Sequence, residues 1–162
     1  IIIMNFRVGL GFDIHELIAG TMIKLAGVSI PSKKMIKAHS DGDIIYHSLA
    51  DAILGALSKG DIGMHFPDSD LKNKNLDSGK ILSHAYSLMI NNKYIINNID
   101  ITLILEEPKI KKYKDNMCQN ISSLLHCNSD LINIKATTSE SIGFVGRGEG
   151  IACHTIVSII SD

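Results

Sequence analysis

The feature that most constrains the fold is one strongly apolar helix with segments of β-type sequence on both sides. Between Asp43 and Leu57 the apolar residues recur at helical spacing, at Ile45, Leu49, Ala52, Ile53 and Ala56. Asp41 or Asp43 can serve as the N-cap, and Gly60 follows closely behind the end of the helix. A helix with this pattern buries its apolar side, so the sequence predicts a layer of helices packed on a layer of strands.

The other segments alternate between strand-like and helix-like sequence. Stretches rich in Val, Ile and Leu predict strands at 5–11, 22–30, 95–105, 132–137 and 151–160, with the first two paired to each other. Further helices are predicted at 78–91 and 109–125, and long loops at 61–78 and 139–150. No linker or repeat interrupts the chain. We therefore expect a single domain over residues 1–162, an α+β two-layer sandwich with a mixed β-sheet and helices on one face.

Charge and composition exclude several classes of protein. The chain has 162 residues, of which 16 are Lys or Arg, 17 are Asp or Glu and 45% are hydrophobic. This balance is typical of a globular protein, and a net charge of -1 provides no basic surface for broad nucleic-acid binding. No apolar run approaches the ~18 residues of a membrane span. The 3 Cys include no C-x-x-C pair, which favours free thiols in a reducing compartment.

A first candidate metal-binding pair follows the strand predicted at 5–11. In Asp13-Ile14-His15, extended backbone would place the Asp13 and His15 side chains on the same side. Carboxylate oxygen and imidazole nitrogen both suit zinc, and a catalytic zinc site uses three protein ligands with one position left open. Alone, this short pattern is also typical of a strand-end Asp beside a surface His, so a third ligand has to come from elsewhere.

The segment from His39 to His47 is the best source of that third ligand. His47 lies in the first turns of the apolar helix, and Asp43 or Asp51, four residues away on either side, could hold its other ring nitrogen. The alternative is a solvated acidic stripe, but a polar face on so apolar a helix favours a cavity. We therefore expect Asp13, His15 and His47 to bind one Zn²⁺.

Two further segments carry residues suited to phosphate or sugar chemistry. The loop from Asp61 to Asp70 is acidic and could bind a hard cation or sugar hydroxyls, although a plain solvated loop explains it equally well. The segment from Thr137 to Glu140 places hydroxyls beside a Gly-rich loop that carries Arg147, which suits a diphosphate, with Glu140 available to Mg²⁺. A merely tight connection would use the same residues. Lys109, after Glu107-Pro108, could meet a base or phosphate.

Taken in order, these segments resemble one enzyme family, 2-C-methyl-D-erythritol 2,4-cyclodiphosphate synthase. The motifs that carry the resemblance are GFDIH at 11–15, AHSDGD at 38–43 with His47, DIG and FPDSD within 61–70, EEPK at 106–109, ATTSE at 136–140 and GFVGRGEGIAC at 143–153. Each motif is weak alone, but the ordered set covers nearly the whole chain and is very specific. The resemblance implies a ferredoxin-like fold assembled as a homotrimer.

The resemblance also implies roles for individual residues. Asp13, His15 and His47 would hold zinc, and Glu140 would help to hold Mg²⁺ or Mn²⁺ on the substrate diphosphate. His39 and Thr138 match residues that stabilise the transition state. The positions that match substrate-binding residues are Asp13, Ile14, His15, His39, Ser40, Asp61, Ile62, Gly63, Phe66, Pro67, Asp68, Ser69, Asp70, Leu105, Glu106, Glu107, Pro108, Lys109, Ile110, Lys111, Thr137, Thr138, Ser139, Glu140, Phe144 and Arg147.

The implied reaction is a phosphorus-oxygen lyase reaction of the non-mevalonate isoprenoid pathway. The 2-phosphate of a cytidine diphosphate-linked methylerythritol attacks the β-phosphate, which closes a cyclic diphosphate and releases CMP. Because the nucleophile is already anionic, alignment and charge neutralisation can supply most of the catalysis. The family's active sites lie between subunits. In family members an apolar cavity on the trimer axis can hold an isoprenoid diphosphate, and Phe12, Phe144 and Arg147 match the residues that line it.

The residues alone are also compatible with two other functions. A zinc-dependent phosphohydrolase would use the same three ligands but make water the nucleophile. A noncatalytic nucleotide- or isoprenoid-binding trimer would bind CMP without turnover. The expected compartment is the cytoplasm for a bacterial protein, and the plastid or apicoplast stroma for a eukaryotic one. No nucleic-acid or membrane partner is expected.

Overall fold

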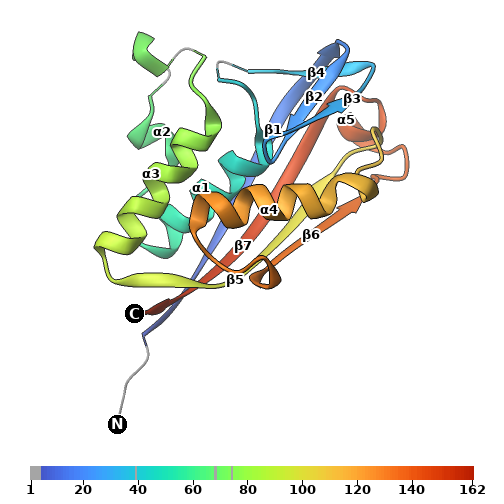
Figure 1. The fold of residues 1–162 in the computed structure, drawn as a ribbon. Coiled ribbons are helices and arrows are strands. Elements are labelled where there is room, and N and C mark those ends of the chain that lie inside the picture. The colour runs from blue at the N-terminus through green and yellow to red at the C-terminus, as the bar shows by residue number, and fades with distance from the viewer. Residues whose placement is uncertain (1–4, 39, 68, 74) are drawn as a thin grey trace.

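The computed structural model describes residues 5–38, 40–67, 69–73 and 75–162 (Figure 1). Its strands are β1 (Phe6–Ala19), β2 (Met22–Leu25), β3 (Val28–Pro31), β4 (Lys34–Lys37), β5 (Tyr94–Ile104), β6 (Ile132–Thr137) and β7 (Gly150–Ser161). Its α-helices are α1 (Ile44–Ala56), α2 (Ile62–His65), α3 (Ser78–Asn91), α4 (Lys114–Leu125) and α5 (Gly143–Gly146). Short 3₁₀ turns cover Leu71–Asn73, Lys111–Tyr113 and Ser129–Leu131. The helices predicted at 43–57 and 78–91 are confirmed almost to the residue.

One mixed sheet forms the first layer of the molecule. Its strand order is β4-β1-β7-β5-β6, with β5 and β6 parallel and the other neighbours antiparallel. Helices α1, α3 and α4 lie together along one side of this sheet, and α4 connects the two parallel strands (Figure 1). The predicted α+β class with a mixed sheet is confirmed. Among the described residues, no helix combines the length and apolar content needed to cross a bilayer.

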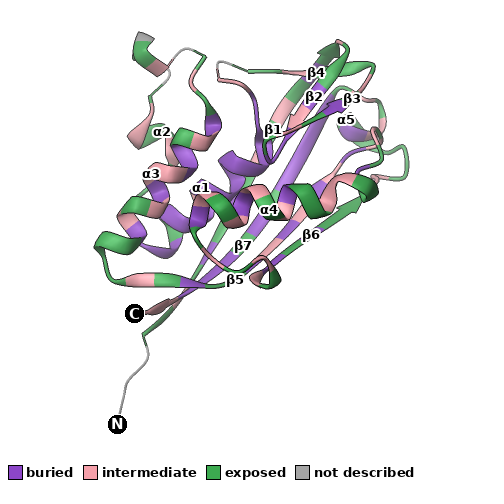
Figure 2. Cartoon of the chain, viewed as in Figure 1, coloured by how far each residue is buried: buried purple, intermediate pink, exposed green. Residues whose placement is uncertain are grey.

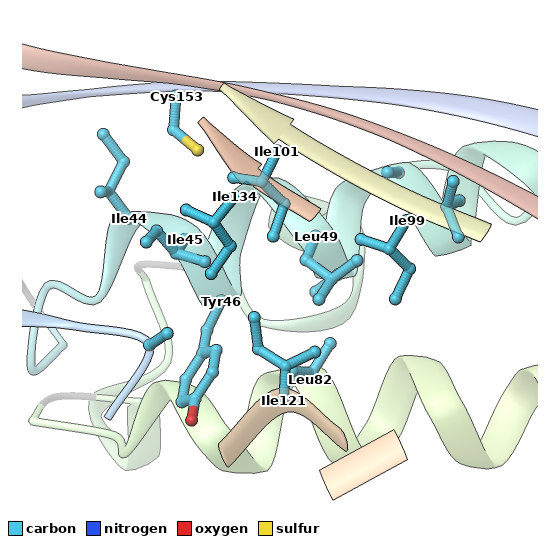
Figure 3. Close-up of a cluster of buried hydrophobic side chains, with 14 of the residues drawn as sticks. Ile44, Ile45, Tyr46, Leu49, Leu82, Ile99, Ile101, Ile121, Ile134 and Cys153 are labelled. Carbon is cyan, nitrogen blue, oxygen red and sulfur yellow. The ribbon is translucent and has the colours of Figure 1, made fainter. Parts of the chain in front are cut away.

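Helix α1 is the centre of the core. All but two of its 13 residues are buried, and its ribbon is almost entirely in the colour of buried residues in Figure 2. Figure 3 shows side chains of α1, such as Leu49, packed between Ile99 and Ile101 of the sheet and Leu82 and Ile121 of the outer helices. Burying this much apolar surface is the main free-energy source for the fold, and it holds the first turn of α1 in one place.

Two glycines let the backbone of β1 approach α1 closely. A Cβ added at Gly9 would lie 1.8 Å from the carbonyl oxygen of Ala52, and one at Gly11 would lie 1.8 Å from that of Ser48. Alternation along β1 then directs the Asp13 and His15 side chains to the same helix-covered side of the sheet. The close approach therefore brings these two side chains to the N-terminal end of α1.

The opposite side of β1 carries a row of exposed apolar residues, which we call the open face. Its exposed fractions range from 47% to 63%, at Phe6, Val8, Leu10, Phe12 and Ile14. On the neighbouring strand β7, Ile156 is also exposed, and the His154 ring lies 4.5 Å from the Phe12 ring. A contiguous exposed apolar patch of this kind usually marks a site of interaction with another molecule.

The predicted strand boundaries and one predicted pairing were wrong near the N-terminus. Strand β1 does not end at Gly11 but continues to Ala19, because its ladder with β7 extends to the Glu16–Gly150 pair and its ladder with β4 continues from there to the Ala19–Lys34 pair. The strand expected at 22–30 is instead the hairpin β2–β3, which turns at Ala26 and Gly27, both with positive φ. It forms its own two-stranded sheet and does not pair with β1. The expected loop at 61–78 contains helix α2 and a 3₁₀ turn.

Candidate metal centre and substrate cavity

Three potential ligands converge between strand β1 and helix α1. The Oδ2 atom of Asp13 lies 3.1 Å from Nδ1 of His15 and 3.3 Å from Nδ1 of His47. The three donor atoms lie within 4.8 Å of one another, and the two imidazole ring centroids are 5.1 Å apart. A carboxylate and two imidazoles in this arrangement can hold a divalent cation with a coordination position left for a substrate oxygen.

The environment of these atoms also fits a cation. His15 Nδ1 is buried, and although it lies 3.1 Å from Asp13 Oδ2, the geometry of that contact does not make a hydrogen bond and no other described residue supplies one, whereas buried nitrogens normally have a partner. Burial opposes ionisation of Asp13, but the contacts with His15 and His47 outweigh it, so the pKa of this carboxyl lies below its usual value. An ionised carboxylate beside an unpaired ring nitrogen is the donor set that zinc prefers.

The two acidic residues expected to support His47 lie elsewhere. Asp43 is the N-cap of α1, and its carboxylate accepts hydrogen bonds from the amides of Ala26 and Gly27 at 2.8 and 2.7 Å. It therefore anchors the β2–β3 turn. Asp51 accepts a hydrogen bond from the Ile62 amide at 3.0 Å and anchors the start of α2. The prediction that either carboxylate holds the ring of His47 was wrong, because backbone N–H groups occupy both.

Ser78, a residue with no predicted role, contacts the second ring nitrogen of His47. Ser78 Oγ lies 2.9 Å from His47 Nε2, and Ser40 Oγ lies 3.2 Å from the same atom. Ser78 is fully buried at the first turn of α3, and its hydroxyl also donates to Asp41. A serine at a helix start is common, so the local pattern contains no signal that would distinguish this one.

A cavity of about 360 Å³ opens beside the three ligands. Its walls come from β1, β4, α1, α2 and α3, and its lining residues are Asp13, Ile14, His15, Glu16, Lys37, Ala38, Ser40, His47, Ile62, Gly63, Phe66, Asn73, Leu76 and Ile81. Eight of these were predicted as site residues. Asp61 caps α2 at the edge of this region, and Pro67, Ser69 and Asp70 follow in the exposed loop. His39 and Asp68 lie outside the described residues.

The predicted nucleotide- and phosphate-binding segments form a second group at the C-terminal ends of β5 and β6. Because these strands are parallel, residues 105–111 and 137–140 emerge at the same edge of the sheet. The Leu105 amide donates to the Thr137 carbonyl at 3.0 Å. In the first segment Leu105 and Ile110 are buried, while Glu107, Lys109 and Lys111 are exposed, with Pro108 half-buried.

Hydrogen bonds shape the loop that follows β6. The amide and hydroxyl of Ser139 both donate to Oε1 of Glu106 at 2.9 Å, and these bonds lower the pKa of Glu106. Thr138 Oγ1 donates to Oε1 of Glu140 at 3.0 Å. Glu140 itself has a positive φ and an exposed side chain. The carboxylate and the neighbouring hydroxyl thus face solvent together, where they can meet a cation or phosphate.

The metal centre and this second group are far apart within one chain. Asp13 lies opposite Cys153 of β7, and Cys153 lies opposite Leu103 of β5. Leu103 in turn pairs with Ala136, just before Thr137. Strand spacings of ~4.8 Å therefore place Asp13 roughly 14 Å from the start of residues 137–140, across three spacings, and roughly 10 Å from the end of β5 that leads into residues 105–111, across two. None of residues 105–111 or 137–140 lines the cavity. One described chain does not bring the two predicted halves of the site together.

The residues expected near the trimer axis have partners within the chain. Arg147 and Glu149 form a two-pronged ion pair, with nitrogen–oxygen distances of 2.9 and 3.0 Å, on the exposed turn after α5. Phe144 lies in α5, about a third exposed, near Gly150 at the start of β7. The sequence patterns did not predict the Arg147–Glu149 pair.

Comparison with known proteins identifies the family. A family model described as the YgbB family matches residues 6–160. The chain belongs to this family. A relative from Clostridium botulinum named 2-C-methyl-D-erythritol 2,4-cyclodiphosphate synthase is 48% identical over 154 residues, which cover 95% of this chain and 98% of the relative. A relative of the same name from Acinetobacter baumannii is 47% identical over 157 residues, 97% of this chain and 98% of the relative. The family resemblance inferred from the motifs is confirmed.

Solved structures with related sequences share this fold. The "IspF (Plasmodium falciparum) CDP complex" is 36% identical and superimposes with a TM-score of 0.86, covering 97% of both chains. The bifunctional IspDF of Campylobacter jejuni is 43% identical with a TM-score of 0.94 over 98% of this chain. This chain spans 43% of that bifunctional protein.

Proposed function

We propose that the protein converts 4-diphosphocytidyl-2-C-methyl-D-erythritol 2-phosphate to 2-C-methyl-D-erythritol 2,4-cyclodiphosphate and CMP, as a lyase of the non-mevalonate isoprenoid pathway. The observation that carries the proposal is the convergence of Asp13, His15 and His47 on one wall of a cavity. The names of the curated relatives and the CDP complex of a family member support the same reaction.

Asp13, His15 and His47 are proposed to hold Zn²⁺. A zinc ion bound there would polarise and orient the β-phosphate of the substrate. The chain's own contribution is to hold the three donor atoms in place through the close packing of β1 on α1, and to leave one side of the centre open to the cavity. Ser40, on the cavity wall, is proposed to bind the methylerythritol phosphate, and His39 to stabilise the transition state.

The second group of residues is proposed to bind the cytidine diphosphate. Residues 105–111 and 137–140 would hold the base and phosphates, Glu140 would hold Mg²⁺ or Mn²⁺, and Thr138 would stabilise developing charge. Asp61 to Gly63 are proposed to bind the ribose, and Phe66 to Asp70 to line the methylerythritol side. These assignments rest on the family motifs together with the exposed hydroxyls, carboxylate and lysines described above.

We further propose that the active enzyme is a homotrimer with active sites between subunits. Residues 105–111 and 137–140 do not line the cavity beside Asp13, His15 and His47 in one chain, so we propose that the second half of each site comes from a neighbouring subunit. The open face of β1 provides an apolar surface for such an assembly. Phe12, Phe144 and Arg147 would then line an axial cavity able to accept an isoprenoid diphosphate. We also propose that residues 1–162 form a single domain of the ferredoxin-like type. The proposed compartment is the cytoplasm in a bacterium, or the plastid or apicoplast stroma in a eukaryote.

One experiment tests the reaction. The purified protein is incubated with the cytidylyl substrate, Zn²⁺ and Mg²⁺, while CMP release and the phosphorus NMR spectrum are followed. We expect CMP and a cyclic diphosphate in equal amounts. An uncyclised product or free phosphate would instead indicate a zinc-dependent phosphohydrolase, and CMP binding without turnover would indicate a noncatalytic binding protein. Either outcome would reject the proposed reaction.

A further inference from the structure

The hydroxyl of Ser78 lies between two groups that constrain its single proton. On one side is Oδ1 of Asp41, to which Ser78 donates, and on the other side is Nε2 of His47 at 2.9 Å. A carboxylate oxygen can only accept, and a serine hydroxyl has one proton to donate. With that proton directed to Asp41, Ser78 Oγ is left as an acceptor toward His47. Nε2 must then carry the proton of this hydrogen bond.

Asp41 is held in the ionised, accepting form. Its Oδ1 also accepts the backbone amide of Ser78 at 3.2 Å, and its Oδ2 lies 2.5 Å from Nζ of Lys24. Partial burial opposes ionisation, but the bonds from Lys24 and Ser78 outweigh it and lower the pKa of this carboxyl. Lys24 comes from the β2–β3 hairpin, so three separate segments of the chain determine where the proton of Ser78 points.

The alternative tautomer of His47 would close the metal centre. A proton on Nδ1 could be donated to Asp13 Oδ2, which is only 3.3 Å away, and it would occupy the lone pair that a metal needs. Ser40 does not prevent this, because its hydroxyl accepts from the Gly42 amide at 3.1 Å and keeps its own proton free to donate to Nε2. Ser78 is thus the contact that discriminates between the tautomers.

We propose that Ser78 is a positioning residue that keeps a proton on Nε2 of His47, so that Nδ1 is the nitrogen available to a metal ion. Asp41 and Lys24 act through Ser78 by fixing the direction of its hydroxyl. The inference rests on the proposed metal centre for its consequence, but the position of the proton is a property of the metal-free protein. Groups that orient a metal-binding histidine in this way typically change metal affinity 10- to 100-fold when removed, by the order of magnitude seen for outer-shell contacts.

The position of the proton can be measured directly. Long-range proton–nitrogen NMR of the ¹⁵N-labelled, metal-free protein, recorded above the ordinary imidazole pKa of about 6.5, reports whether each ring nitrogen carries a proton. The His47 signals are assigned by their loss in His47→Ala. We expect a protonated Nε2 in the wild type, and a largely unprotonated Nε2 in Ser78→Ala and in Asp41→Ala. Ser87→Ala, an exposed serine on the same helix, should leave the signals unchanged.

Zinc affinity provides the second measurement, by competition with a chelator. We expect Ser78→Ala to weaken zinc binding about 10- to 100-fold, and Ser87→Ala to leave it unchanged. An unprotonated Nε2 in the wild type, or unchanged proton position and zinc affinity in Ser78→Ala, would overturn the inference. If Ser78→Ala does not fold, Asp41→Ala decides by the same criteria. If the proposed metal centre itself is wrong, the result differs from these outcomes, because the wild type and Asp13→Ala would then bind zinc with the same affinity.

Discussion

Nδ1 of His47 and Oδ2 of Asp13 lie 3.3 Å apart, although 34 positions separate the two residues in the sequence. His47 comes from the buried helix α1 and Asp13 from the middle of β1, so the contact exists only because strand and helix pack closely. If this pair is part of a metal centre, as proposed, it has consequences for metal content, stability and assembly.

The first prediction concerns bound metal. Replacing His47 by Ala removes one of three donor atoms, and we expect bound zinc to fall from about one equivalent per chain to well below one half. Elemental analysis of the purified proteins measures this. His126→Asn is a suitable control, because the His126 ring lies beside Tyr86, 5.4 Å between ring centroids, away from the cluster, and Asn tolerates its left-handed backbone. Full zinc occupancy in His47→Ala would disprove the assignment.

The second prediction concerns the close approach of β1 and α1. Gly11→Ala places a methyl group 1.8 Å from the Ser48 carbonyl oxygen, so the helix must shift. We expect a loss of about 4 kcal/mol or more in the free energy of unfolding, measured with denaturant. Gly55→Ala is the matched control, since its Cβ would have no neighbour closer than 4.0 Å. It should stabilise the helix by about 0.5–1 kcal/mol. Similar effects of the two substitutions would contradict this explanation.

The third prediction concerns pH. Burial raises the pKa of Asp43 from its ordinary value of 3.8 to about 6 and outweighs the three backbone N–H bonds that favour the charge. Between these values the folded protein binds more protons at this site than the unfolded chain. The contribution of Asp43 to stability is therefore present below about pH 4 and is lost as the pH rises to about 6.

Asp43→Asn removes that pH-dependent contribution. It also turns an amide N–H₂ toward one of the backbone donors, so we expect a loss of about 1–3 kcal/mol at neutral pH. Denaturant titrations from pH 4 to 7, taken as differences from the wild type, measure both effects. Asp77→Asn changes the exposed N-cap of α3 in the same way and should cost much less, because Asp and Asn cap helices about equally well. An identical pH dependence in wild type and Asp43→Asn would refute the assignment.

The fourth prediction concerns the proposed trimer. Leu10 is 63% exposed at the centre of the open face, and a buried Glu at that position would lose its hydration without gaining a partner. We expect Leu10→Glu to shift the mass measured by light scattering from trimer to monomer. Ile90→Glu, on the outer surface of α3, should leave the mass unchanged. A Leu10→Glu protein that remains a trimer would place the interface elsewhere.

Much of the fold follows from short-range patterns. The helical spacing from Ile45 to Ala56 and the acidic N-cap at Asp43 predict α1 almost to the residue, because both signals act within a few turns of one segment. The two-residue period of extended backbone likewise predicts that the Asp13 and His15 side chains lie on one side of the strand. The sequence alone therefore predicts the three residues of the candidate metal centre as ligands.

The hydrogen-bond partners of those residues were decided only by tertiary structure. Asp43 has the right spacing to reach His47, yet it binds the hairpin amides of Ala26 and Gly27, because a turn with positive φ presents two free N–H groups to it. Ser78 reaches His47 from 31 positions away. Local periodicity determines which segments are helix or strand and which side is apolar. The partners of a buried polar group depend on how whole elements pack, because burial requires each donor and acceptor to be satisfied by whatever lies within reach.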